Sequence, residues 1–213
     1  MRIYIKTHER AILLVNGLPE RWLEPGRHRI FAWFRKVEVK RFDTDALIVQ
    51  LRPEYRALAP TDQVEPVLIE GEQRAIVWQR GKPARWLGVG LWHVWRVDST
   101  VRVERVDVTE IATKPLAAEL AAIVSPSDYV EQMVPTGFVA QRYVDGALDA
   151  ILKPGRHAAW TITHKVTFAL VDLRERILQV SGQDVMTRDR VTLRLNVAAT
   201  FRVADPQRLA AVA

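Results

Sequence analysis

The amino-acid sequence predicts a mainly β protein made of three tandem small antiparallel β-domains with short connecting helices. The first observation is a repeat, in which two glycines and an aspartate recur at intervals of 64 and 65 residues. The recurring positions are Gly17, Gly81 and Gly146; Gly26, Gly90 and Gly155; and Asp43, Asp107 and Asp172. The second observation is a strict apolar–polar alternation near the C-terminal end, which is typical of a strand. Regular repeats indicate several copies of one structural unit along the chain.

Each copy, over residues 9–43, 73–107 and 138–172, has the same predicted order of elements. A short apolar strand runs into a turn that holds the first glycine; Asn16-Gly17 and Asp145-Gly146 are strong hairpin signals, and Arg80-Gly81 is a weaker one. A second strand follows, then a turn at the second glycine. Pro154-Gly155 suits the central positions of a type II turn, because glycine accepts a positive φ. An alternating strand then closes each copy.

The segments between the copies predict short helices over residues 53–60 and 115–124. Pro115 suits a first helical position, and Leu116, Leu120 and Ile123 would share one face of that helix. We therefore place the domain boundaries near Thr61 and Ser127. The predicted domains are residues 1–60, 61–126 and 127–213.

The alternating segment near the C-terminal end predicts a long strand with one buried and one exposed face. The residues expected to point inward are Val191, Leu193, Leu195, Val197 and Phe201. A polar turn over residues 187–190 precedes this strand, and further strand-like sequence precedes the turn. After the strand, Asp205 suits a helix cap and Pro206 a first helical position.

Residues 182–206, GQDVMTRDRVTLRLNVAATFRVADP, resemble the signature of the SPFH (band 7) family, the stomatin and slipin group. The resemblance extends back to about Thr136. It implies an SPFH-like last domain, truncated at its C-terminal end, in a non-enzymatic scaffold protein that assembles into rings or cages, often at membranes. The plan of small β-repeats leading into such a domain also resembles the repeats of the major vault protein. We expect assembly to need segments beyond Ala213, so that this chain is monomeric or a weak small oligomer.

Composition restricts the classes of partner. The chain lacks cysteine, which excludes a disulfide framework and a thiolate metal site. Its net charge of +6 comes from arginines dispersed along the chain, so nucleic acid is an unfavoured partner. We find neither a signal peptide nor a run of about 20 apolar residues, the length that crosses a bilayer. We expect a cytoplasmic protein, either free or peripheral at the inner face of a membrane.

No residue pattern predicts an active site. His28 and His157 occupy equivalent places after the second glycine, where the middle copy has Trp92 followed by His93, and we interpret them as polar residues after a turn. His164 has no ligand-type neighbour in sequence. The repeated aspartates are interpreted as turn-fixing residues. We therefore predict no catalytic residue, no cofactor-binding residue, no metal ligand and no cofactor, since neither a nucleophile motif nor a complete dinucleotide glycine pattern is present.

Seven tryptophans are many for 213 residues. We interpret them as filling the small cores or the seams between copies; the alternative is an exposed aromatic surface for a partner. The sequence therefore favours a self-associating scaffold, with a membrane surface or a membrane protein as a further candidate partner. The alternative function is a soluble binding module whose basic, Trp-rich repeats hold a protein or an anionic lipid.

Overall fold

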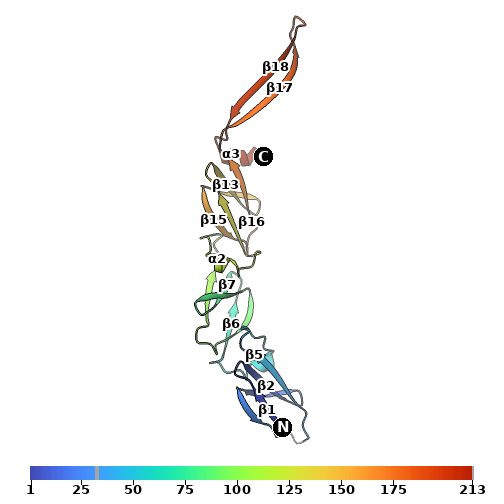
Figure 1. The fold of residues 1–213 in the computed structure, drawn as a ribbon, viewed down its shortest axis with the longest axis vertical. Coiled ribbons are helices and arrows are strands. Elements are labelled where there is room, and N and C mark those ends of the chain that lie inside the picture. Colours follow the sequence, from blue (N-terminus) through green and yellow to red (C-terminus); the bar gives the residue numbers. More distant parts are fainter. Residues whose placement is uncertain (32–33, 213) are drawn as a thin grey trace. The chain divides into compact units, whose positions relative to one another are not determined.

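The computed structural model describes residues 1–31 and 34–212 and is mainly β (Figure 1). The prediction of a mainly β chain with small antiparallel sheets is confirmed. The strands are β1 (Arg2–Ile5), β2 (Glu9–Val15), β3 (Leu18–Leu23), β4 (Gly26–Arg29), β5 (Val37–Asp43), β6 (Val64–Ile69), β7 (Gln73–Gln79), β8 (Lys82–Leu87), β9 (Gly90–Trp95), β10 (Arg102–Asp107), β11 (Ala112–Thr113), β12 (Tyr129–Val134), β13 (Phe138–Val144), β14 (Ala147–Leu152), β15 (Gly155–Trp160), β16 (Val166–Asp172), β17 (Arg176–Met186) and β18 (Thr192–Phe201).

One arrangement of strands recurs in the three segments. Three-stranded sheets have the orders β3-β2-β5, β8-β7-β10 and β14-β13-β16. Each is accompanied by an antiparallel pair, β1-β4, β6-β9 or β12-β15, and β11 adds to the last of these. The register recurs as well: Ala11 lies opposite Leu23, Ala75 opposite Leu87 and Ala140 opposite Leu152. A register shift follows at the equivalent place in each hairpin.

Left-handed backbone closes each of these hairpins. Asn16, Arg80 and Asp145 have φ values of 52°, 51° and 50°, and the glycine after each also has a positive φ. Two successive positive φ angles define the tight turn whose twist matches that of the flanking strands. The Arg80-Gly81 hairpin therefore forms although its sequence signal is the weakest of the three.

The second glycine of each copy has a different conformation from the one that the sequence predicted. Gly26, Gly90 and Gly155 have φ values of 135°, 138° and 142°, positive as expected but far from the +80° of a type II turn. Each glycine instead begins a strand, in the mirror image of the extended conformation. Only glycine adopts this backbone without steric conflict.

The chain divides into two compact units. Unit 1 comprises Met1–Thr109 and Ala118–Val124, and unit 2 comprises Glu110–Ala117 and Ser125–Ala213. The first two copies thus share unit 1. The predicted division into residues 1–60, 61–126 and 127–213 stays a prediction.

Strand β2 is buried on both faces and joins two cores of unit 1. Ala11 and Leu13 pack in the core of the first copy, together with Ile3 and Ile5 of β1. Ile12 points to the other face, into a second core cluster. The members of that cluster are Ile12, Leu14, Val49, Leu51, Tyr55, Val64 and Trp95. We call this cluster the seam, because it takes residues from both copies.

Aromatic rings complete the seam. Trp22 stacks on Phe42 with ring centroids 6.2 Å apart and meets Trp95 at 6.1 Å. Phe42 in turn contacts the edge of Tyr55 at 6.4 Å. Trp95 is 1% exposed, so the seam is a true interior and not a surface contact. These contacts hold the two copies together in one unit.

The helices are short. They are α1 (Pro53–Arg56), α2 (Ala118–Ala121) and α3 (Pro206–Val212). The helix expected over residues 115–124 begins later than predicted, at Ala118. The backbone N–H of Leu116 lies before this helix and donates a hydrogen bond to the Tyr129 hydroxyl. The cap of α3 is as predicted, since Asp205 Oδ1 accepts hydrogen bonds from the Gln207 and Arg208 backbone N–H groups.

The predicted burial of the long strand is wrong. β18 pairs with β17 in a two-stranded ribbon, and the residues expected to point inward are 43% to 55% exposed. They are Val191, Leu193, Leu195, Val197 and Phe201. Alternation along a strand establishes which residues share a face, but burial needs a second layer. Within the part of unit 2 that the structure describes, no other strand pairs with this ribbon.

The glycine that begins β15 yields the first test. We expect Gly155→Ala to destabilise the protein by about 1 to 3 kcal/mol through backbone strain alone, because an added Cβ would meet only ordinary contacts, the nearest at 3.8 Å from His157 Nε2. Gly88→Ala is the matched control, since Gly88 has open space and no positive φ. Urea unfolding measures both, and equal free energies of unfolding would contradict the strain argument.

The seam yields a second test. Ile12 is fully buried, so Ile12→Ala should cost about 2 to 5 kcal/mol in the free energy of unfolding of unit 1. Leu68→Ala, at a 52% exposed position of the same unit, should change that free energy by about 0.5 kcal/mol or less. A small cost at Ile12 would show that the two copies do not depend on the seam.

Candidate functional site

The residues proposed as candidates for chemistry have structural roles. Among residues 1–31 and 34–212, no group of three or more histidine and acidic side chains is placed to hold a metal ion. None of the helices in this described part is both long and apolar enough to cross a bilayer. The candidate functional surfaces therefore have to be found by following the polar contacts and the exposed side chains.

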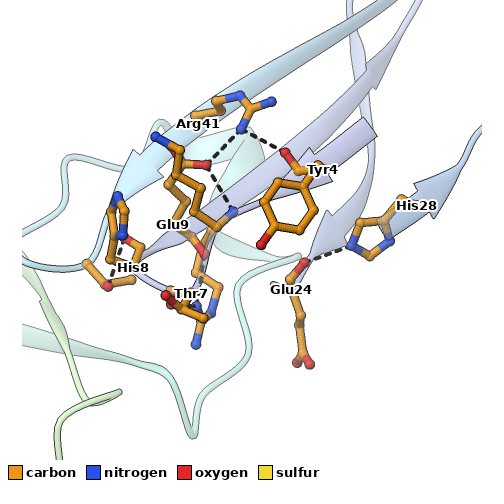
Figure 2. A network of polar contacts seen from close by, with 10 residues as sticks. Tyr4, Thr7, His8, Glu9, Glu24, His28 and Arg41 are labelled. Carbon is orange, nitrogen blue, oxygen red and sulfur yellow. Dashed lines mark hydrogen bonds and ion pairs between the residues drawn. The ribbon is translucent and has the colours of Figure 1, made fainter. Parts of the chain in front are cut away.

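The two equivalent histidines anchor the chain before the second glycine. His28 Nε2 lies 2.7 Å from the Glu24 carbonyl oxygen (Figure 2), and His157 Nε2 lies 2.8 Å from that of Lys153. In the middle copy the Trp92 indole N–H donates to the Gly88 carbonyl at 2.8 Å. A tryptophan can replace the histidine because the position needs only one ring N–H donor. This contact is local, four residues back along the chain.

The repeated aspartates fix the turns that end each copy. Asp43 Oδ1 accepts from the Asp45 N–H, Asp107 Oδ1 from the Thr109 N–H and Asp172 Oδ1 from the Arg174 N–H. Each bond spans two residues, as in an Asx turn. The Arg174 side chain also donates to Asp172, and its hydrogen bonds hold the Asp172 pKa far below its usual range.

His164 has a partner that sequence inspection missed. His164 Nδ1, in the loop that joins β15 to β16, lies 2.7 Å from Asp145 Oδ2, in the turn between β13 and β14. The hydrogen bond from His164 is the main cause of a lowered Asp145 pKa, and the Lys165 backbone N–H adds to it. The two residues are 19 positions apart, so no local spacing could have shown the pair.

Several polar side chains of the first copy form a network of hydrogen bonds and ion pairs (Figure 2). Arg41 Nη1 donates to Glu9 Oε2 at 2.7 Å and to the Tyr4 carbonyl at 3.1 Å. The Lys6 backbone N–H donates to the same Glu9 oxygen, and with Arg41 it lowers the Glu9 pKa. Arg41 is thus neutralised by a carboxylate, which distinguishes it from other arginines of this copy.

The network continues into the second copy through Gln63. Buried Arg10 donates from Nε to Gln63 Oε1 at 2.7 Å, and Gln63 Nε2 donates to Glu24 Oε1 at 2.8 Å. Arg10 Nη1 also donates to the Thr7 carbonyl. These bonds reinforce the seam with polar contacts and present no group that is poised to react.

The tryptophans are mostly interior side chains. Trp95 and Trp160 are buried, and the other tryptophans that the structure describes are partly buried. Those are Trp22, Trp78, Trp86 and Trp92. Trp33 lies outside the described residues. The interpretation as core and seam filling applies to Trp22, Trp92 and Trp95, which belong to or pack against the core clusters, and none of the six described tryptophans is exposed.

The β17–β18 ribbon presents an exposed surface with one apolar side. Leu178 lies opposite Ala199, Val180 opposite Val197, and Val185 opposite Leu193. Residues opposite each other in a ladder share a face. We define the apolar face as Leu178, Val180, Val185, Leu193, Leu195, Val197, Ala199 and Phe201.

A bulge is needed to form this apolar face. Val180 and Val185 are five residues apart, so strict alternation would place them on opposite sides of β17. The register shifts between Val180 and Gln183, where Gly182 has a φ of 69°. The extra residue returns Val185 to the side of Val180. Most apolar side chains of the ribbon therefore lie on one side. Arg176 and Gln183 share that side, opposite Phe201 and Leu195, while Ile177 and Met186 lie on the other side.

Buried His93 yields a test by pH. Burial, and then the nearby Arg56 charge, lower the His93 pKa below 6.5. The unfolded state therefore binds the proton more readily, and unit 1 should lose stability as the pH falls below about 6.5. His93→Leu should flatten this dependence between pH 7 and pH 5, as measured by urea unfolding at each pH. Equal slopes for parent and variant would contradict the assignment.

The comparisons with known proteins agree with the sequence resemblance. Residues 132–213 match the family model described as SPFH domain / Band 7 family. No curated protein and no solved structure matches the chain significantly, so the likeness to major vault protein repeats gains no support. The matched range begins within β12 and includes β13 to β18 and α3. The C-terminal part of this chain, residues 132–213, is accordingly similar to the SPFH (Band 7) family.

Proposed function

We propose that this chain is a non-enzymatic SPFH scaffold that associates with copies of itself through the apolar face of the β17–β18 ribbon. The SPFH domain supports the general class, because proteins of this family are generally non-enzymatic, membrane-associated and prone to self-association. The observation that carries the proposal is the exposure of a mainly apolar face within residues 132–213.

Exposed apolar area of this kind provides a driving force for association. Removing apolar surface from water stabilises a contact by about 25 cal/mol per Å². Leu193, Leu195 and Val197 are 46%, 43% and 55% exposed in the single chain, so each has area left to bury. A two-stranded ribbon is also marginally stable alone and gains from a third strand or a second layer. Contact with a partner at this face would both bury the exposed apolar area and stabilise the two-stranded ribbon.

A second copy of the chain is the occupant that the ribbon itself favours. Both of its strands are long edges, of 11 and 10 residues, with unpaired backbone groups along their outer sides. The polar side holds both signs of charge, since Asp184 lies opposite Arg194. Two identical ribbons related by a two-fold axis would present the same apolar face to each other.

The two copies of unit 1 and the similar strands of unit 2 serve as spacers in this proposal. They share one strand order. The histidines after their second glycine form hydrogen bonds with backbone carbonyls four residues earlier in the chain. We retain three domains, residues 1–60, 61–126 and 127–213, as a proposal about the division of the chain, in which the third domain contains the β17–β18 ribbon. We also propose that the scaffold acts in the cytoplasm at the inner face of a membrane.

The alternative function is a binding module for a protein or an anionic lipid. The buried tryptophans argue against an aromatic surface over the first two copies. A specific observation still favours binding, namely an unneutralised basic surface on β1 and β4. This basic surface could bind a partner whether the chain functions as a scaffold or as a separate binding module.

Charge placed on the apolar face tests self-association. We expect the parent chain to form a weak, small oligomer reversibly at micromolar concentration, as measured by analytical ultracentrifugation or light scattering. Leu195→Glu should weaken this association by at least about tenfold, because a carboxylate in an apolar contact carries a desolvation penalty. The fold should be unaffected, since Leu195 is exposed in the single chain.

Thr192→Glu is the matched control, because Thr192 is exposed on the opposite side of the same strand. The dissociation constant of this variant should stay within about twofold of the parent value. The corresponding change in binding free energy is well below the roughly 1.4 kcal/mol of a tenfold change. A parent chain that stays monomeric, or equal effects of the two variants, would show that the apolar face is not the contact.

A further inference from the structure

The outer side of the β1–β4 ribbon gathers positive charge. Ile3 and Ile5 point into the core of the first copy, so the alternate residues Arg2 and Tyr4 point outward. Arg2 lies opposite Arg29, and Tyr4 lies opposite Arg27. We call these four outward residues the arginine face. Together with Ile3 and His28, they line a pocket of about 390 Å³.

Within the part of the chain that the structure describes, the three arginines of this face have no acidic partner. The ion pairs of the described residues include Arg41 with Glu9, but none that involves Arg2, Arg27 or Arg29. Like charges directly opposite each other on a ladder destabilise the sheet. Arg2 and Arg29 are such a pair, and an anion bound between them would remove the repulsion. The His28 ring nitrogen Nε2 makes its hydrogen bond with the Glu24 carbonyl oxygen (Figure 2), so His28 does not neutralise these arginines.

The same strand positions differ in the other two copies. In the second copy the places of Tyr4 and Arg27 are taken by Leu68 and Leu91, which lie opposite each other. In the third copy Arg156 takes the place of Arg27, but Glu131 binds it at 2.8 Å. The fold therefore needs no cluster of arginines here. The positive face belongs to the first copy alone and is not a property of the repeated unit.

We propose that the arginine face binds a phosphate monoester group. A guanidinium presents paired N–H donors that match phosphate oxygens, and it remains charged at all physiological pH values. A phosphate monoester has a charge of about −1.5 to −2 near neutral pH and three acceptor oxygens. It can therefore satisfy more than one arginine at once, and the exposed Tyr4 hydroxyl supplies a further donor. A single carboxylate has only two oxygens and one charge.

The phosphate can be carried by a lipid headgroup or by a free phosphate compound, and the test separates these sources. Glycerol 3-phosphate, a soluble phosphate monoester, is titrated into the full chain by calorimetry. Vesicles containing phosphatidic acid are compared in co-sedimentation with phosphatidylserine vesicles of matched charge. If the chain binds phosphatidic acid vesicles but not glycerol 3-phosphate, the ligand is a membrane headgroup; if it binds only glycerol 3-phosphate, the ligand is a soluble phosphate compound. Either result supports the phosphate site if it depends on the arginines.

The variants establish that dependence. Arg27→Gln combined with Arg29→Gln should weaken the binding by at least about tenfold, since it removes two charge-assisted contacts. Arg21→Gln is the matched control, because Arg21 is an exposed arginine of the same copy outside this face, and it should bind within about twofold of the parent. Circular dichroism and urea unfolding verify that all three proteins are folded.

Two results would overturn the proposal. One is equal loss of binding in the double variant and in Arg21→Gln, which would reflect net charge and not a site. The other is failure of both phosphate probes at low salt, including the case in which an acidic peptide such as polyglutamate binds to the arginine face instead.

Discussion

A small antiparallel sheet can bury a face only against another layer, and this constraint governs the whole chain. In the first copy, the β1–β4 pair covers one side of the β3-β2-β5 sheet and encloses Ile3, Ile5 and Leu13. Without the seam, the other side of β2 would be exposed to solvent. In the seam, Ile12 packs in one cluster with Trp95 of the next copy. The first two copies therefore form one unit, because the second face of the central strand of the first copy is covered in the seam.

The same constraint explains why the β17–β18 ribbon is the candidate for assembly. The sequence of β18 alternates, and the Gly182 bulge of β17 places Val185 on the side of Val180. No other strand pairs with the ribbon within the described part of unit 2. A mainly apolar face that is left exposed favours the proposed contact with a partner.

Comparison of the three copies distinguishes positions that maintain the fold from positions that are candidates for function. Contacts that recur in all three copies maintain the frame, as do the ring N–H bonds of His28, Trp92 and His157. The outward positions of β1–β4 and its equivalents are free to differ, and they hold arginines, leucines or an internal ion pair. Because the frame is constant, a difference at these positions reflects what each copy meets at its surface.

Sequence alone determined the features that depend on near neighbours. The hairpin turns at Asn16 and Asp145, the Asx turns of the repeated aspartates and the Asp205 cap follow from residues within a few positions of each other. The SPFH resemblance was readable for the same reason, since its signature is one continuous stretch. Tertiary structure alone decided which strand faces are covered, that His164 pairs with Asp145, and that Arg2, Arg27 and Arg29 share one face. Alternation specifies which side chains lie together, whereas burial and pairing depend on what distant parts of the chain bring to that side.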